Sequence, residues 1–295
     1  MAIDFSVVTT YASDELPLRT YRARDGEMLA YALAEVPGAD TCLVFCHGSS
    51  ARHEYLAGFA RHVSTALGIA VCTPTFRGHG DNPRRRGDID YIDQLEDDAI
   101  DLLRQLRDAG YARFFVGGHS SGGGFAVRLA ASPRFAREGL SIEGIVLGAP
   151  MLGYKAVSSR KDSGGWAVPQ LGVMVGALLL NALGVHALDA RVALRFVLPE
   201  RLRAVSTTEY SYRMYAGMHP RSVSGGDIRR IAVPLLIVVG SDDEIFIADK
   251  YAELLRQYKQ DGEVVIVPGV RHISMMADQK VQEVIIEWLR KTRFE

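Results

Sequence analysis

The stretch GGHSSGGG, residues 117–124, places two adjacent serines among glycines directly after a short apolar run. A serine in a G-x-S-x-G motif acts as a nucleophile when it lies on a sharp turn between a strand and a helix. The residues two before and two after that serine crowd together, so both must be small. Ser120 has Gly118 and Gly122 in these places, whereas Ser121 has a histidine on one side. We therefore predict Ser120 as the nucleophile; the alternative is a glycine-rich turn whose serines cap a helix.

Two loops late in the chain hold the base and the acid that a serine nucleophile needs. The apolar stretch 234–240 runs into Asp242 and Asp243, and the stretch 262–269 leads to His272. In one known arrangement of this chemistry the chain order is serine, acid and histidine, with each partner in a loop after a strand. His272 is the predicted base, and by position alone either aspartate can orient it.

Attack on a carbonyl creates an oxyanion, which backbone N–H groups stabilise. One donor is expected directly after the nucleophile, at Ser121. The second is expected in the stretch HGSS, which also follows a short apolar run, because its glycine lets the backbone turn the N–H of Ser49 toward the same oxygen. We assign His47 and Gly48 to the substrate site, with His47 holding the loop by hydrogen bonds rather than acting as a base.

The elements that must position these residues alternate along the chain. Two strand-like stretches, 16–24 and 27–35, meet at an Asp-Gly pair, which is the strongest short signal for a hairpin. Short apolar runs typical of strands buried on both faces then recur at 42–46, 69–73, 114–116, 145–147, 235–239 and 264–267. Helix-like stretches separate most of them, as at 91–108, 121–131 and 247–257. This alternation predicts an α/β protein with a mostly parallel eight-stranded sheet between layers of helices.

The alternation breaks over residues 151–227, where an ordinary crossover needs far fewer residues. We expect this segment to be a helical cap inserted between the sixth and seventh strands. Residues 1–150 and 228–295 then form the core that carries the sheet.

Part of the predicted cap, residues 164–188, contains no charged residue. A membrane crossing here would place the two halves of one sheet on opposite sides of a bilayer. We expect instead an apolar helix, broken or started near Pro169, that covers a hydrophobic cavity or dips into a lipid interface. Met174 and Leu178 belong to its apolar stripe, which fits a substrate wall and the packed interior of the cap equally well.

The composition argues against several other functions. The chain of 295 residues is 48% hydrophobic and 23% charged with a net charge of -1, and its basic run 84–86 has acidic neighbours, so nucleic-acid binding is not expected. The eight histidines form neither H-E-x-x-H nor a cluster with cysteine, so neither a metal nor a cofactor is predicted. Cys42, Cys46 and Cys72 lack metal-site spacing and the N-terminus shows no signal peptide, so we expect free thiols in the cytoplasm.

Taken in order, these motifs resemble those of the α/β-hydrolase superfamily, and most closely its monoacylglycerol-lipase and lysophospholipase-like branch. The resemblance runs from about residue 16 to the C-terminus. It lies in HG-x-x at 47–50, RGHG at 77–80, GHSSG at 118–122, G-x-x-D at 240–243 and the loop ending at His272. The resemblance implies the α/β-hydrolase fold with a cap between strands six and seven, and Asp243 as the acid. It also implies hydrolysis of carboxylic esters through an acyl-serine, without a cofactor.

Two positions depart from the branch: Ser121 stands where methionine is common, and Asn82 stands where serine is usual. The cap matches nothing in the branch, so the acyl length and the alcohol of the ester stay open between monoacylglycerols, lysophospholipids and other acyl esters. Ring-cleavage hydrolases of carbon-carbon bonds share the scaffold, and an uncharged cap suits their substrates as well. A ligand-binding protein without activity is the alternative of another class, but such proteins usually lose a member of the triad.

Overall fold

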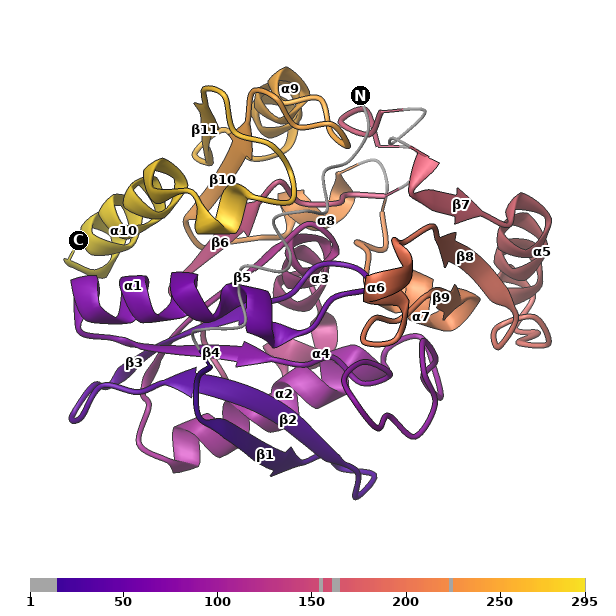
Figure 1. Ribbon diagram of the computed structural model, residues 1–295, viewed down its shortest axis with the longest axis horizontal. Helices are drawn as coiled ribbons and strands as arrows, with labels where there is room; N and C mark the ends of the chain where they lie inside the picture. The colour runs from indigo at the N-terminus through magenta and orange to yellow at the C-terminus, as the bar shows by residue number, and fades with distance from the viewer. Residues whose placement is uncertain (1–14, 154–155, 161–164, 223–224, 295) are drawn as a thin grey trace.

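The centre of the protein is one eight-stranded sheet. The computed structural model describes residues 15–153, 156–160, 165–222 and 225–294 (Figure 1). The strands are β1 (Leu18–Arg22), β2 (Met28–Ala34), β3 (Thr41–Cys46), β4 (Ala70–Pro74), β5 (Arg113–His119), β6 (Gly144–Gly148), β10 (Leu235–Gly240) and β11 (Glu263–Val267). Their order across the sheet is β1, β2, β4, β3, β5, β6, β10, β11. Among these strands only β2 runs in the direction opposite to the others, which confirms the predicted α/β-hydrolase sheet.

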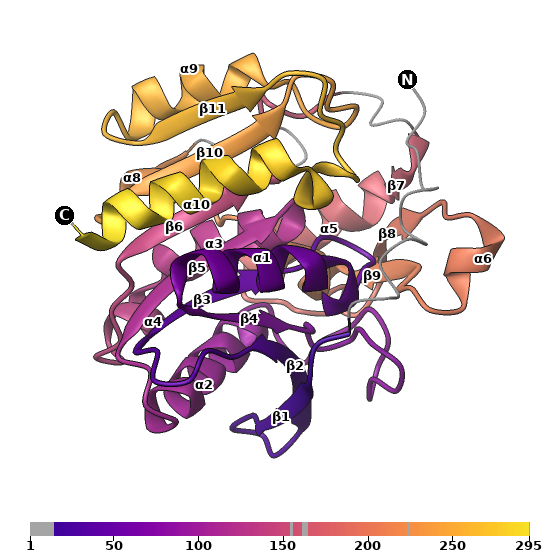
Figure 2. The same ribbon diagram turned by 60° about the vertical axis from the view of Figure 1, so that its left-hand side comes forward.

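Helices cover both faces of the sheet. The longer ones are α1 (Ala57–Leu67), α2 (Gln94–Asp108), α3 (Ser121–Ala130), α9 (Asp249–Tyr258) and α10 (Gln279–Phe294). Helices α1 and α10 lie side by side on one face, and α2 and α3 pack together on the other (Figure 2). Every residue of β3, β4, β6 and β10 is consequently buried, which explains why these strands are continuous apolar runs rather than alternating ones.

The segment between β6 and β10 contains helices, as predicted, and also a small sheet that the sequence analysis does not anticipate. Its elements are β7 (Ala167–Pro169), α5 (Leu171–Ala182), β8 (Val192–Phe196), α6 (Glu200–Arg203), β9 (Glu209–Ser211), α7 (Tyr212–Gly217) and α8 (Gly226–Arg229). Strands β7, β8 and β9 pair antiparallel. The cap is therefore mixed rather than purely helical. The sequence analysis missed its strands because, at three to five residues, they are too short for an alternating pattern to be recognised.

The apolar helix expected near Pro169 is α5, which begins two residues after this proline. The division into a core and a cap over 151–227 stays a prediction. Residues 1–14, 154–155, 161–164, 223–224 and 295, which fall within these predicted segments, lie outside the described residues.

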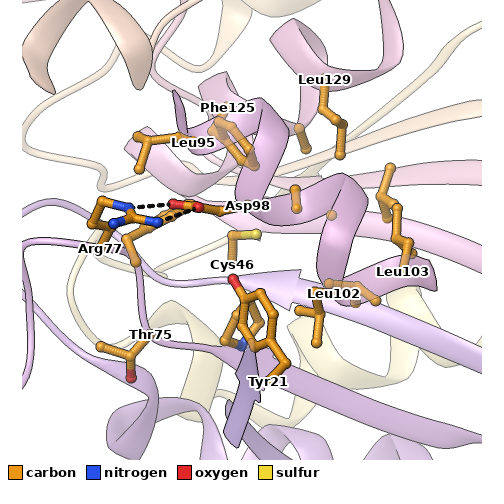
Figure 3. Close-up of a pocket in the computed structure, with 17 residues that line it drawn as sticks. Tyr21, Cys46, Thr75, Arg77, Leu95, Asp98, Leu102, Leu103, Phe125 and Leu129 are labelled. Carbon is orange, nitrogen blue, oxygen red and sulfur yellow. Dashed lines mark hydrogen bonds and ion pairs between the residues drawn. The ribbon is translucent and has the colours of Figure 1, made fainter. Parts of the chain in front are cut away.

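A buried ion pair anchors the loop after β4. The Arg77 guanidinium donates two hydrogen bonds to Asp98 on α2, at 2.9 and 2.7 Å, and a third to Asp25 at 2.8 Å. Figure 3 shows Arg77 and Asp98 facing each other, with Leu95 and Phe125 nearby. These residues line a cavity of about 20 Å³. Since the Arg77 side chain is almost fully buried, its charge depends on these carboxylates.

We predict that Arg77→Met lowers the free energy of unfolding by about 3 kcal/mol, because it leaves the Asp98 carboxylate buried without its partner. The double variant Arg77→Met/Asp98→Leu recovers most of this loss, because the most buried of the carboxylates paired with Arg77 is removed too, while the remaining partners Asp25 and Glu27 are partly exposed to water. Urea denaturation at neutral pH measures both. The control is Arg113→Met, whose ion pair with Glu143 is about one-third exposed and is worth less than about 1 kcal/mol. An Arg77→Met loss no larger than that of the control contradicts the prediction.

Candidate active site

Ser120 occupies a sharp turn between β5 and α3. Its φ of 56° and ψ of -119° are rare for a residue with a side chain and cost of order 1–3 kcal/mol. The two flanking glycines make this turn possible. A Cβ on Gly118 would lie 2.3 Å from the carbonyl carbon of Gly122, and one on Gly122 would lie 2.4 Å from the oxygen of Cys46. The spacing used to choose Ser120 over Ser121 thus corresponds to a close backbone contact.

A chain of hydrogen bonds joins the three predicted catalytic side chains. His272 Nε2 lies 3.1 Å from Ser120 Oγ, and His272 Nδ1 lies 2.8 Å from Asp243 Oδ2. None of the three residues is more than 5% exposed. With Nδ1–H donated to the carboxylate, Nε2 is left as the acceptor that can take the serine proton.

The structure distinguishes the two aspartates. Asp243 Oδ1 accepts the N–H groups of Ile245 and Phe246 at 2.8 and 2.7 Å, so its other oxygen is aimed at His272. Asp242 is exposed and accepts the hydroxyl of Ser241 instead. Burial by itself raises the pKa of Asp243, but His272 and the two backbone N–H groups outweigh it, and the pKa lies below its ordinary value. Asp243 is therefore ionised at neutral pH.

Glu244 is a site residue that the sequence analysis missed. Its carboxylate is buried, accepts the backbone N–H of His272 at 2.9 Å and forms an ion pair with Arg271 at 3.2 Å. The ring of His119 packs against the ring of His272, and the two ring centroids are 4.7 Å apart. The available signal was a run of three acidic residues, 242–244, that begins two residues after the end of β10, because one carboxylate can orient the histidine ring while the next holds its backbone.

The predicted oxyanion donors lie next to Ser120. Ser121 is the first residue of α3, so its N–H has no acceptor within the helix and is free to bind an oxyanion. The loop after β3 also approaches the nucleophile, since a Cβ on Gly48 would lie 3.3 Å from Ser120 Cβ. Ser49 follows directly in this loop and lines the same cavity as Ser120.

His47 is fully buried and does not line that cavity. Its Nδ1 donates to the carbonyl oxygen of Gly48 at 2.8 Å, and its Nε2 accepts the N–H of Phe76 at 3.0 Å. Burial, together with the neighbouring His79, lowers the pKa of His47 well below its ordinary value, so the ring is neutral. These bonds match the loop-holding role expected for His47 and leave no contact with a substrate, unlike Gly48, which does line the cavity.

The cavity that contains Ser120 and His272 has a volume of about 810 Å³. One wall is apolar and comes from two places, the cap and the first two strands; it includes Leu198, Leu202, Val205, Trp166, Leu18 and Met28. The rim is polar and includes Arg52, His53, Glu54, Asp81 and Arg201. Among the described residues, no group of three or more His, Cys, Asp or Glu side chains is arranged to hold a metal ion.

Met174 and Leu178 are not brought to this cavity. Leu178 is 62% exposed on the outer side of α5, and Met174 packs partly buried between the core and the cap. The short helix α6 covers the site instead. Its signal in the sequence was Leu198, Leu202 and Val205, three apolar residues spaced three or four apart.

Solved structures with the same fold include lipases and esterases. A soluble variant of monoglyceride lipase from Saccharomyces cerevisiae, in complex with a substrate analogue, aligns with a TM-score of 0.70 at 19% identity, over 95% of this chain and 96% of that one. A monoacylglycerol lipase from Paleococcus ferrophilus aligns with a TM-score of 0.62 at 20% identity, over 90% and 99%. A thermophilic esterase from Thermogutta terrifontis aligns with a TM-score of 0.61 at 17% identity, over 94% and 99%. At these identities the likeness establishes the fold.

The sequence itself gives one family match. No curated protein matches the chain. Residues 37–279 match the model of a hydrolase family described as serine aminopeptidase, S33. This range contains the sheet from β3 onward, the cap, and Ser120, Asp243 and His272. This match covers well over half of the chain, and the protein therefore belongs to that family of α/β hydrolases.

Proposed function

We propose that the protein is a serine hydrolase that cleaves carboxylic esters through an acyl-serine intermediate. The observation that carries this proposal is the buried chain from Asp243 through His272 to Ser120, which opens onto a cavity of about 810 Å³. Family membership and the lipases and esterases among the solved structures of this fold support it. Because Asp243, His272 and Ser120 are all present and joined by hydrogen bonds, a ligand-binding protein without activity is disfavoured.

In this mechanism His272 Nε2 takes the proton of Ser120 as the serine oxygen bonds to the ester carbonyl carbon. The carbonyl oxygen becomes an oxyanion held by the N–H groups of Ser49 and Ser121, each worth about 3 to 4 kcal/mol. The C–O bond to the alcohol then breaks, and His272 gives its proton to the leaving oxygen. Water repeats the sequence on the acyl-serine, which releases the acid and restores Ser120. Ionised Asp243 stabilises the imidazolium in both halves.

The cavity favours an ester with one apolar chain and a polar alcohol. Its apolar wall, from Trp166 and Leu202 on the cap side to Leu18 and Met28, suits an acyl chain. Its charged rim suits a hydroxylated or phosphorylated alcohol. Monoacylglycerols and lysophospholipids have this combination, and we propose them as the substrate class ahead of ring-cleavage products.

We predict that Ser120→Ala lowers kcat/KM on p-nitrophenyl esters by about 10⁴-fold or more, because the nucleophile is lost. Asp243→Asn lowers kcat by a similar factor, since the amide oxygen stays with the N–H groups of Ile245 and Phe246 and the amide NH2, which can only donate, faces His272 Nδ1 and imposes the wrong tautomer. The matched control is Asp242→Asn, one residue away and exposed, which changes kcat/KM by less than about twofold. Initial rates on esters from acetate to palmitate measure all of these effects.

Two outcomes contradict the ester hydrolase. One is wild-type protein that cleaves a ring-cleavage dienoate but no ester, which assigns the site to carbon-carbon hydrolysis. The other is Ser120→Ala protein with ester turnover close to that of wild type.

We further propose that α5 brings the site to lipid by lying in a membrane interface. Its apolar residues Leu171, Val175, Leu178 and Leu179 recur at helical spacing, yet they point outward and are all more than half exposed. Figure 1 shows α5 at the outer edge of the molecule, away from the main sheet. No helix of the described residues is long and apolar enough to cross a membrane. An apolar stripe turned to the outside is typical of helices that lie on a bilayer.

Charge favours an anionic lipid surface as the partner of α5. Residues 165–222 contain six arginines and three acidic residues, so this part of the cap carries a net charge of 6 − 3 = +3, whereas the whole chain has -1. Arg191 directly precedes the neighbouring strand β8 and Arg195 lies within it, and both are exposed. Arginines beside an apolar helix add attraction to anionic headgroups.

We predict that wild-type protein binds vesicles of phosphatidylcholine and phosphatidylglycerol at 3:1 more tightly than vesicles of phosphatidylcholine alone. Leu178→Glu weakens this binding at least about tenfold, because a charge replaces an apolar group that enters the interface. Val157→Glu, at a position that is 61% exposed and not part of α5, is the matched control and binds as wild type does. Turnover of p-nitrophenyl acetate is the same in all three proteins.

Co-sedimentation with vesicles and sedimentation velocity without them separate the outcomes. Wild-type protein that does not sediment with either vesicle contradicts the lipid proposal. A concentration-dependent dimer that Leu178→Glu abolishes assigns α5 to a second copy of the chain instead.

We also propose that the protein works in a reducing compartment, because its cysteines are free thiols. Cys42, Cys46 and Cys72 are buried free thiols, and burial raises the pKa of both Cys42 and Cys46 to about 12. Neutral thiols inside a core are inert and stay reduced in the cytoplasm, where we place the enzyme.

A further inference from the structure

One cap side chain reaches into the loop that carries the proposed oxyanion donor. Tyr210 on β9 is only 1% exposed, and its hydroxyl accepts the N–H of Ser50 at 2.8 Å. The same hydroxyl lies 2.7 Å from His79 Nε2 in the loop after β4. His79 Nδ1 lies 3.1 Å from the carbonyl oxygen of Arg77, which can only accept, so Nδ1 carries the proton and Nε2 accepts from Tyr210. Burial lowers the pKa of His79 to about 4, which keeps this direction at neutral pH.

The cap holds Ser50 by two further hydrogen bonds. Ser50 Oγ donates to the carbonyl oxygen of Thr207 at 2.7 Å, and the N–H of Thr207 donates to the carbonyl oxygen of Ser50 at 3.1 Å. Thr207 precedes β9, so both partners of Ser50 belong to one short cap segment. The N–H, the side chain and the carbonyl of a single loop residue are thereby all bonded to the cap.

Ser50 needs this support because of its backbone. Its φ is 67°, in the left-handed region, and it lies at the third position of a turn closed by the N–H of Ala51 on the carbonyl of Gly48. Glycine normally takes such a position, and for a residue with a side chain this backbone conformation costs of order 1–3 kcal/mol of stability. The closing hydrogen bond is long, at 3.4 Å, so the turn contributes little to its own stability. Ser49 is the other central residue of this turn.

We propose that Tyr210 is a positioning residue that makes the oxyanion donor of Ser49 depend on the placement of the cap. With Tyr210 and Thr207 docked, Ser50 keeps its left-handed conformation and the N–H of Ser49 faces the reacting carbonyl. When this cap segment moves away, Ser50 relaxes and that donor is lost. The inference rests on the proposed serine mechanism and adds to it that the cap, besides covering the substrate, assembles half of the oxyanion hole.

The test is Tyr210→Phe, which deletes the hydroxyl and keeps the ring that packs against Phe196. We expect kcat on p-nitrophenyl esters to fall about tenfold while KM changes less than twofold, because the donor acts in the transition state. Inhibition by an alkyl trifluoromethyl ketone, whose serine adduct is an oxyanion, weakens by the same factor. Tyr212→Phe is the matched control, since its ring lies in the separate cluster with Ala177 and Ala193, and it keeps wild-type values.

A second variant separates positioning from general damage. Glycine adopts a φ of 67° without strain, so Ser50→Gly added to Tyr210→Phe restores at least a third of the lost kcat. Wild-type kcat in Tyr210→Phe, or lost kcat with unchanged inhibition by the ketone, overturns the inference. So does the absence of any rescue by Ser50→Gly. Each of these results leaves the serine mechanism standing as long as Ser120→Ala is inactive, whereas an active Ser120→Ala removes the mechanism itself.

Discussion

The close contact between Gly118 and Gly122 is the constraint on which the site depends. It lets β5 turn into α3 within one residue, and that residue is Ser120, raised above the edge of the sheet in a strained conformation. Any side chain at either glycine meets backbone atoms that cannot move aside. The strain at Ser120 is therefore supported by packing of the sheet and α3 around the turn, rather than by the turn alone.

Parallel strands bring the remaining groups to the same place. The loops after β3, β5, β10 and β11 all leave the carboxyl edge of the sheet, so Asp243 and His272 meet Ser120 although the histidine is 152 residues from the serine along the chain. Burial of these residues makes each hydrogen bond strong and keeps the acid oriented. The segment between β6 and β10 contributes Trp166, Leu198, Leu202 and Val205 to the cavity at this edge.

Much of the fold followed from the sequence, because strands buried on both faces appear as continuous apolar runs and the turn at Ser120 has its own spacing. The choice of Asp243 over Asp242 did not follow from position, since only the backbone N–H groups of Ile245 and Phe246 aim one carboxylate at His272. Glu244 was missed for a similar reason: its partner is a backbone group 28 residues away.

The cap was the least predictable part. Its strands are too short for a period to emerge, and the apolar pattern of α5 indicated a helix but not the direction of its apolar side. Leu178 faces outward, and Leu202 on α6 lines the cavity in the place that the sequence analysis left open for the apolar stripe of α5. Tyr210 belongs to no recognisable sequence motif either, because the positioning role that we propose for it depends on a contact with Ser50, which is 160 residues away in the sequence.

The central claim is that Ser120, and not its neighbour Ser121, is the nucleophile of a working hydrolase. Peptide mapping by mass spectrometry after treatment with a fluorophosphonate tests it most directly, because the reagent bonds covalently to an activated serine. We predict one adduct per chain, located at Ser120. An adduct at Ser121, or an unmodified folded protein, would contradict the claim.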